Sequence, residues 1–304
     1  MEDSCTSGFF GPDDIPVPGG LRQLTVLTPP GDGPFVLYKY VRAGRIVVLK
    51  AIREELRGNF LHEEILKKEF EIGRSLNHPN IREYYSLCTI PGLGQCIEME
   101  WIDGCTLEEL MPACREDSGL CDKIASQIID AVRFIHLKQV IHRDLKPSNI
   151  LITHNGQNVK LIDFSLSDSD TYCILKGHAG SARYASPEQV SCSGSDFRSD
   201  IYSLGVILSE MSDRRRYRNV AAKCTRKDMA RRYKDISQLE TALFRTLPYR
   251  AIIIAVIVIA VVSSAVTTII HGGGNSARED DYVDKVTIDK IFQQATDLLE
   301  DSDY

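Results

Sequence analysis

The sequence predicts an α+β fold in which strands come first and helices follow, with one transmembrane helix near the C-terminus. Residues 21–50 alternate apolar and polar side chains in short runs, the period of strands with one buried face. Residues 121–137 repeat apolar side chains at helical spacing, and residues 198–211 are apolar around most of a helix. Residues 251–270 carry no charge over twenty positions, enough at about 1.5 Å per residue to span the roughly 30 Å hydrocarbon layer of a bilayer.

Length, composition and charge narrow the class of protein. The 304 residues are 43% hydrophobic and 26% charged, as in ordinary globular chains of one or two domains. Residues 271–304 hold nine acids and three bases, so they carry the whole net charge of −6 and residues 1–270 sum to zero. With no basic face expected, nucleic acid is not an expected partner. None of the nine cysteines forms a Cys-x-x-Cys pair, which favours reduced thiols over a metal site.

The N-terminal part begins with a segment that has no expected secondary structure. Residues 1–20 are predicted to be a flexible leader, because proline, glycine and aspartate dominate there without an apolar period. They lack the basic and apolar regions of a signal peptide. Strands are then expected over residues 21–28, 35–42 and 45–52, with a turn at Ala43-Gly44.

Lys50 lies inside the third of these strands, among apolar residues. An unpaired charge is costly to bury, so Lys50 needs an anionic partner. The next expected helix, residues 62–76, has an apolar face and several carboxylates. Its candidate partners for the lysine are Glu63, Glu64, Glu69 and Glu71.

The most informative stretch is residues 142–150, which read His-Arg-Asp-Leu-Lys-Pro-Ser-Asn-Ile. It places a carboxylate, an ammonium and a carboxamide in a proline-containing loop between apolar runs, where reactive side chains can converge. It resembles the H-R-D-x-x-x-x-N catalytic loop of protein kinases at every defined position. A hairpin expected after it ends in Asp163-Phe164-Ser165, where kinases have D-F-G.

The chain therefore resembles a Ser/Thr protein kinase, and its arrangement is similar to the membrane-bound Hanks-type kinases of bacteria. The resemblance implies the two-lobed protein-kinase fold over residues 21–247. A small β-rich N-lobe with one helix would cover residues 21–102, and a larger, mainly helical C-lobe would cover residues 103–247. The transmembrane helix 251–270 would follow.

Mg²⁺-dependent transfer of the ATP γ-phosphate to Ser or Thr hydroxyls is the activity that this resemblance implies. Such transfer needs positioning and charge neutralisation more than covalent catalysis. Asp144 would accept or orient the proton of the attacking hydroxyl, and Lys146 would contact the γ-phosphate. Asn149 and Asp163 would hold Mg²⁺. The implied partners are ATP and protein substrates.

The resemblance also implies an ATP pocket. Lys50 would contact ATP phosphate and pair with Glu69, which is found by counting back from the turn at residues 77–80. The glycine-rich loop departs from the family pattern, because it lacks a third glycine, is one residue short, and carries Pro34, which offers no N–H. The loop glycines, the residue beside the adenine and the two backbones that bond its ring would be Gly31, Gly33, Met99, Glu100 and Ile102.

Other residues are implied to support the site. Asp200 would bond the backbone of the catalytic loop, and Glu188 would form a buried ion pair with Arg232. Arg143 would bind a phosphate on the activation segment, although the usual phosphosite position falls near Gly177. The candidate acceptors are Ser169, Thr171 and Tyr172. The remaining residues implied to shape or line the site are His142, Phe164 and Ser181.

Several departures favour an alternative, a pseudokinase, scaffold or sensor that binds partners with little catalysis. Gly73 stands one turn after Glu69, where relatives have a bulky apolar residue, and Tyr84 is expected to fill the space. Ser165 replaces the glycine of D-F-G and has less φ freedom. Only twelve residues separate Met211 from Cys224, fewer than the family has. Against this alternative, the sequence keeps all of Lys50, Asp144, Asn149 and Asp163.

The membrane orientation is predicted from charge. Arg245 and Arg250 precede the span and acids follow it, which predicts a cytoplasmic kinase domain and an outside tail in a single-pass cell-membrane protein. Residues 271–304 are this acidic extracytoplasmic tail, and apolar residues recur at helical spacing between Val283 and Leu299. Pairing of that stripe or of the membrane helix with a second copy, binding of another partner, and a surface helix without a role all stay open.

Overall fold

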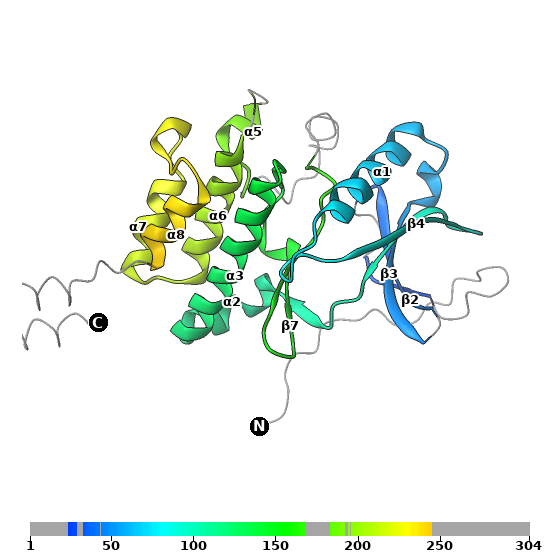
Figure 1. Cartoon of the computed structure of the whole chain (residues 1–304), viewed down its shortest axis with the longest axis horizontal. Coiled ribbons are helices and arrows are strands. Elements are labelled where there is room, and N and C mark those ends of the chain that lie inside the picture. The colour runs from blue at the N-terminus through cyan, green and yellow to red at the C-terminus, as the bar shows by residue number, and fades with distance from the viewer. Residues whose placement is uncertain are drawn as a thin grey trace, which may run out of the picture. The chain divides into compact units, whose positions relative to one another are not determined.

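Two lobes are built by the described part of the chain in the computed structural model, residues 24–28, 33–42, 44–167, 183–191, 194 and 196–244 (Figure 1). The predicted α+β arrangement, with a β-rich lobe before a helical one, is confirmed within these residues. The predicted leader 1–20, span 251–270 and tail 271–304 lie outside them. In the ranges that the structure describes, no helix is long and apolar enough to cross a membrane.

The N-lobe contains one antiparallel sheet in the order β1-β2-β3-β5-β4. Gly44 has a φ of 79° at the tight turn between β2 and β3, a backbone conformation that glycine adopts without strain. Lys50 lies opposite Leu37 on one side and Ile97 on the other, in the centre of the sheet. The five strands are β1 Thr25–Val26, β2 Phe35–Arg42, β3 Arg45–Ile52, β4 Tyr84–Ile90 and β5 Gly94–Glu100.

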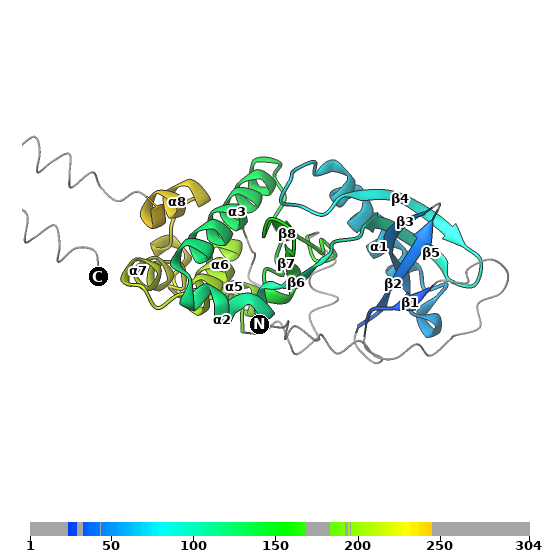
Figure 2. The same ribbon diagram turned by 90° about the horizontal axis from the view of Figure 1, so that it is seen from below.

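Helix α1, Phe60–Ser75, packs against β4 and β5 (Figures 1 and 2). A short 3₁₀ turn, Glu54–Leu56, precedes it. The helix begins with Asn59, whose side chain accepts a hydrogen bond from the Leu61 amide and so caps the first turn. Its buried positions follow the three- and four-residue spacing of one helix face, and they are Ile65, Leu66, Glu69 and Gly73.

The C-lobe is mainly helical, with a three-stranded sheet in the order β6-β7-β8 beside the helices. Thr106 caps α2 in a reciprocal capping box with Glu109. The 20-residue helix α3 has an apolar face that is almost completely buried. The elements are β6 Gly104–Thr106, α2 Leu107–Glu116, α3 Ser118–Leu137, η2 Pro147–Asn149, β7 Ile150–Thr153, β8 Val159–Leu161, α5 Pro187–Ser191, α6 Phe197–Met211, α7 Arg215–Cys224, η3 Met229–Arg231 and α8 Ile236–Phe244.

One continuous apolar core extends from α1, β3 and β5 into α3 and α6. The backbone joins the lobes at a parallel bridge between Ile81 and Leu161. There the Arg82 amide donates to the Leu161 carbonyl at 3.0 Å, and the Leu161 amide donates to the Asn80 carbonyl at 2.8 Å. These bonds fix β8, which leads into Asp163, against the segment that enters β4.

The short stretch between Met211 and Cys224 forms helix α7, which packs on α6. At the start of this helix, Asp122 of α3 accepts hydrogen bonds from Arg214, Arg216 and Tyr217. This part of the lobe is therefore short but closed by specific contacts.

Candidate functional site

Lys50 is buried between two carboxylates. Its Nζ is 2.6 Å from Glu69 Oε2 and 2.9 Å from Asp163 Oδ1. Of the four glutamates considered as partners, Glu69 is the buried one, with 1% of its surface exposed. Strand β3, helix α1 and the segment after β8 thus converge on a single ammonium group.

The pKa values of this cluster are shifted by burial and by the charges that face each other. Burial lowers the pKa of Lys50, but the carboxylates of Asp163 and Glu69 outweigh it, and the net pKa is raised. Burial raises the pKa of Asp163, and Lys50 more than reverses this, so the carboxyl stays ionised. For Glu69, burial dominates over Lys50 and the pKa is raised. The cluster is a fixed arrangement of charge that water screens poorly.

The predicted catalytic loop brings Asp144, Lys146 and Asn149 together. Asn149 Nδ2 donates to the backbone oxygen and to Oδ2 of Asp144, both at 2.9 Å. Lys146 Nζ lies 2.8 Å from the same Oδ2. Pro147 begins the 3₁₀ turn that follows Lys146, where its fixed φ and missing N–H suit a first turn. This turn allows Lys146 and Asn149 to contact the same carboxylate of Asp144.

The loop and the Lys50 cluster lie next to each other. The Ile162 amide donates to the Asn149 carbonyl at 3.0 Å, which sets the residue before Asp163 against the loop. In the register of β7 and β8, Ile150 is opposite Leu161. The side chains at positions 50, 144, 149 and 163, far apart in the sequence, therefore gather in one place.

Asp200 holds the catalytic loop from the side of α6, and it is completely buried. Its two oxygens accept from the amides of His142 and Arg143, each at 2.9 Å. His136 Nε2 lies 2.8 Å from Oδ2 of the same carboxylate. Burial raises the pKa of Asp200, and the bonds from His136 and His142 more than offset this, so the net pKa is lowered.

Two residues of the site have backbone φ in the left-handed region. Arg143 has a φ of 65° and Asp163 a φ of 67°, which are uncommon for residues with a Cβ. The Arg143 carbonyl accepts from Gln189 Nε2 at 2.8 Å, and the Arg143 side chain donates to the Ser167 carbonyl. For Arg143, these contacts over-determine the backbone, which is the condition under which such strain persists.

Phe164 is fully buried between the lobes. Its ring lies 5.0 Å from the ring of His142 and 6.4 Å from that of Tyr84. Ser165 is not among the described residues with positive φ, so the predicted loss of φ freedom has no consequence for the backbone seen here. The Ser165 amide donates to Asp163 Oδ1 at 3.3 Å.

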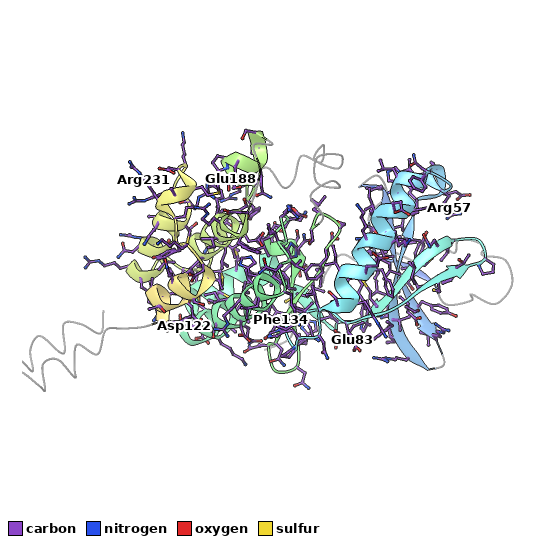
Figure 3. The ribbon with its side chains drawn as sticks, turned by 45° about the horizontal axis from the view of Figure 1, so that its top comes forward. Arg57, Glu83, Asp122, Phe134, Glu188 and Arg231 are labelled. Carbon is purple, nitrogen blue, oxygen red and sulfur yellow. The ribbon has the colours of Figure 1, made fainter. Side chains whose placement is uncertain are left out.

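The segment joining the lobes contains the residues implied for adenine. Met99 and Ile102 are buried. The Glu100 amide donates to the Glu83 carbonyl at 2.9 Å, and Glu100 Oε2 accepts from the Glu83 amide at 3.1 Å and from Lys160 Nζ at 2.9 Å. Glu83 is labelled in Figure 3. The Glu100 amide is thus already committed to the protein.

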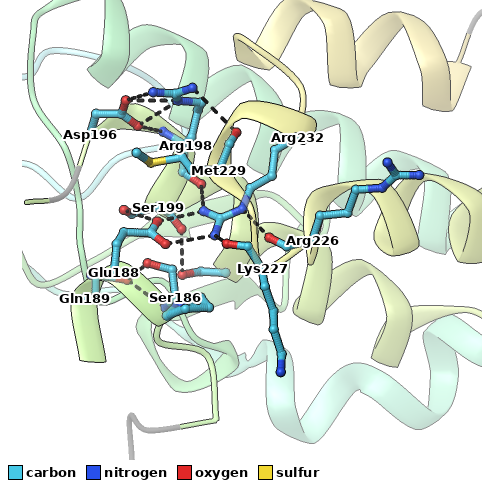
Figure 4. Close-up of polar contacts among 12 residues, drawn as sticks. Ser186, Glu188, Gln189, Asp196, Arg198, Ser199, Arg226, Lys227, Met229 and Arg232 are labelled. Atoms are coloured by element: carbon cyan, nitrogen blue, oxygen red, sulfur yellow. Dashed lines mark hydrogen bonds and ion pairs between the residues drawn. The ribbon is translucent and has the colours of Figure 1, made fainter. Parts of the chain in front are cut away.

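Glu188 and Arg232 form the implied ion pair in the C-lobe (Figure 4). Arg232 Nη1 lies 2.7 Å from Oε1 of Glu188, and Nη2 lies 2.8 Å from Oε2. Burial raises the pKa of Glu188, but the hydrogen bond from Arg232 outweighs it and lowers the pKa to about 2. The pair ties the segment after the activation segment to the loop before α8.

Two implied site residues and the three candidate phosphate acceptors are not described. Gly31 and Ser181 lie outside the described residues, as do Ser169, Thr171 and Tyr172. Gly33 is described, with a φ of 72°, and its carbonyl accepts from Arg53 Nε at 3.0 Å. The degenerate glycine-rich loop is therefore seen only at its C-terminal end, where Phe35 begins β2.

Three residues make contacts at the site that the sequence did not predict. The Phe35 ring lies 5.0 Å from Lys50 Nζ. Tyr84, expected only to fill space, donates from its hydroxyl to Glu69 Oε1 at 3.1 Å. Arg82 is 6% exposed beside Met99 Sδ, and its Nε has no hydrogen-bond partner within the described chain. Nothing in a strand-like Arg-Glu-Tyr sequence marks its arginine as the buried one.

The arrangement can hold a nucleotide with a divalent cation. Asp163 and Asn149 supply carboxylate and amide oxygens, the ligands that Mg²⁺ prefers, and Lys50 supplies a cation for phosphate. No group of three or more His, Cys, Asp or Glu side chains within the described ranges could hold a metal without further ligands. Mg²⁺ is commonly bound by one or two protein side chains together with substrate phosphates.

Comparison with protein families gives one match that covers most of the chain. A family model described as "Protein kinase domain" matches residues 31–272. The matched range includes every residue of the site described above.

The individual proteins that this chain matches include bacterial serine/threonine-protein kinases. The chain is 33% identical over 202 residues to serine/threonine-protein kinase PrkC of Bacillus subtilis, which covers 64% of this chain and 30% of that protein. It is 33% identical over 186 residues to PknB of Mycobacterium leprae, covering 58% of this chain and 29% of that protein. The matches thus span less than a third of either relative.

Among solved structures, the kinase domain of PknI from Mycobacterium tuberculosis is similar in fold. It superposes with a TM-score of 0.55 at 18% sequence identity, covering 74% of this chain and 96% of that one. At this identity the similarity concerns the fold alone.

Proposed function

This chain belongs to the protein kinase family, and from that premise we propose that it transfers the γ-phosphate of ATP to serine or threonine hydroxyls of proteins. The observation that carries the proposal is the convergence of Lys50, Asp144, Asn149 and Asp163. The serine/threonine kinases among the relatives, PrkC and PknB, support the substrate class.

Each side chain has a role that its contacts support. Asn149 and Lys146 both bond Oδ2 of Asp144, which fixes the carboxylate before a hydroxyl arrives. Asp144 then orients the hydroxyl and accepts its proton, while Lys146 turns toward the transferred phosphate. Lys50, positioned by Glu69, contacts the phosphates that stay on the nucleotide.

Asp163 and Asn149 would hold Mg²⁺, which when bound neutralises the charge of the phosphates. Adenine would lie against Met99 and bond the backbones of Glu100 and Ile102. Since the Glu100 amide donates to Glu83, the Glu100 carbonyl is the group that it offers to the ring.

The alternative, a scaffold or pseudokinase with little catalysis, loses part of its support. Tyr84 occupies the space beside Gly73, and Ser165 has no positive φ. The glycine-rich loop and the short stretch between Met211 and Cys224 remain the departures that favour it.

The proposal is tested by phosphate incorporation with the full chain in detergent, Mg-ATP and a generic protein substrate. Asp144→Asn keeps the size of the side chain and should slow transfer about 10²-fold or more. Asp213→Asn, on an exposed residue of the C-lobe, is the matched control and should match wild type. Incorporation equal in all three proteins, or absent from all three despite cooperative unfolding, would support the scaffold instead.

The membrane part of the proposal rests on sequence. Residues 251–270 form a single-pass helix, residues 21–247 form a cytoplasmic kinase domain, and residues 271–304 form an outside tail. A second copy pairs through this tail or through the membrane helix. A cysteine introduced at Ser276 should react with an impermeant thiol reagent on intact cells. Labelling that requires lysis would contradict this orientation. Crosslinking through the same cysteine should give a dimer, and a monomer alone would contradict the pairing.

A further inference from the structure

Helix α1 has a glycine on its buried face where a side chain would not fit. A Cβ built on Gly73 would lie 2.5 to 2.7 Å from three ring atoms of Tyr84. Real Cβ atoms do not approach other carbons so closely, and these ring atoms belong to a side chain that is itself 2% exposed. Glycine is a poor helix former, so its presence here is explained by the close approach of the tyrosine ring.

The hydroxyl of Tyr84 has a partner in the site. It donates to Glu69 Oε1 at 3.1 Å, while Lys50 Nζ approaches the other oxygen, Oε2, at 2.6 Å. The two oxygens of one buried carboxylate are thereby divided between a neutral donor and a charged one. Burial raises the pKa of Tyr84 well above its ordinary value, so the phenol keeps its proton and remains a donor.

The Tyr84 ring also contacts the segment that carries Asp163. It meets the Phe164 ring edge-on at 6.4 Å, and Phe164 lies 5.0 Å from His142 of the catalytic loop. One side chain on β4 therefore touches helix α1 through Gly73 and Glu69, and touches the Asp163 segment through Phe164.

We propose that Tyr84 is a positioning residue: its hydroxyl and ring hold Glu69 and helix α1 where Glu69 pairs with Lys50, and Gly73 is the complementary hole that admits the ring. The kinetic part of this inference rests on the proposed phosphotransfer. The structural part, the placement of α1, does not.

The hydroxyl is tested by Tyr84→Phe in the full chain, which keeps the ring. Turnover should fall about tenfold, because a hydrogen bond to a charged group is lost from a buried carboxylate. Amide hydrogen exchange in α1 should quicken by a similar factor. Tyr85→Phe is the matched control: this neighbouring hydroxyl accepts from Arg45 outside the site, and neither measurement should change. Tyr84→Phe within twofold of wild type in both measurements would overturn the proposal.

The fit between Gly73 and the Tyr84 ring is tested by replacing each residue with leucine, singly and together. Gly73→Leu alone should lower the melting temperature and turnover, because its Cβ meets the ring. Tyr84→Leu alone leaves a cavity and should lower the melting temperature too. The double variant Gly73→Leu/Tyr84→Leu should melt higher than the sum of the single effects predicts, while turnover stays low because the hydroxyl is absent. Additive losses in melting temperature, or turnover restored to wild type, would contradict the proposal.

The two arms separate this inference from the proposed function. If wild type transfers no phosphate, the kinase proposal fails, and hydrogen exchange in α1 still decides whether Tyr84 holds the helix. If wild type is active and Tyr84→Phe exchanges and turns over like Tyr85→Phe, the positioning role fails alone.

Discussion

Arg232→Met is the substitution that should damage the C-lobe most clearly. The Arg232 side chain is completely buried, and five hydrogen bonds satisfy its guanidinium. Two go to the carboxylate of Glu188, and three go to the carbonyls of Arg226, Lys227 and Arg198 (Figure 4). Methionine fills a similar volume but offers no donor, so one buried carboxylate and three carbonyls lose a partner.

The loss follows from the burial of Glu188, which is 9% exposed. Breaking a buried pair by removing one partner costs about 3–5 kcal/mol, because the other charge stays buried without compensation. For a domain of this size, about 1 kcal/mol shifts the melting temperature by roughly 2–4 °C. Arg232→Met should therefore melt about 6–20 °C below wild type.

Thermal unfolding followed by circular dichroism measures this difference. Arg231→Met is the matched control, because Arg231 is the preceding residue, is 71% exposed and pairs at 3.3 Å with an exposed Asp228. It should change stability by less than about 0.5 kcal/mol. The double variant Arg232→Met/Glu188→Gln should recover part of the loss, since the uncompensated charge is gone.

The pH dependence provides a second, independent readout. Burial alone would raise the pKa of Glu188, and Arg232 lowers it to about 2. A carboxyl with a lowered folded pKa stabilises fully above its unfolded pKa of about 4.5 and loses this contribution as pH falls toward 2. The gap between wild type and Arg232→Met should narrow below about pH 4.5. A melting loss under 2 °C, or a gap that widens on acidification, would refute this account of the pair.

Two further substitutions probe groups next to the site. Asp200→Asn keeps one acceptor oxygen but removes the charge that bonds the amides of His142 and Arg143, so stability should fall by about 1–3 kcal/mol. Turnover should also fall, with the KM for ATP little changed. Calorimetry measures the stability and steady-state kinetics the turnover, and unchanged turnover would show that the loop does not depend on this charge. Arg82→Met removes a buried guanidinium whose Nε has no hydrogen-bond partner in the described residues. Because burying an unpaired donor is costly, stability should be unchanged or higher by about 1 kcal/mol. A loss above about 2 kcal/mol in urea unfolding would mean that Arg82 is needed to balance nearby carboxylates.

The strands and helices of the described part were predictable because their apolar periods are strong. The strands predicted over residues 35–42 and 45–52 form β2 and β3 with the same bounds. Of the first predicted strand, 21–28, the structure describes residues 24–28, and among these Thr25 and Val26 form β1, an edge strand that pairs with β2. Local sequence does not reveal how long such an edge pairing continues.

The polar residues of the site were predictable because kinase-like motifs place them at fixed spacings. Asp144, Lys146 and Asn149 lie within six positions, so one 3₁₀ turn brings them together. The partner of Tyr84 and the burial of Arg82 depend on which residues face α1 and β5 in three dimensions. No local pattern encodes those contacts, although Gly73 marks the place where a large side chain from elsewhere must fit.

The structure of this chain with Mg²⁺ and a non-hydrolysable ATP analogue would show whether the four side chains gather around one magnesium–nucleotide complex. We expect the phosphates beside Lys50 Nζ, with the cation bound by Asp163 and Asn149 and the terminal phosphate facing Asp144. A nucleotide bound elsewhere, or a cation that contacts neither Asp163 nor Asn149, would contradict this expectation.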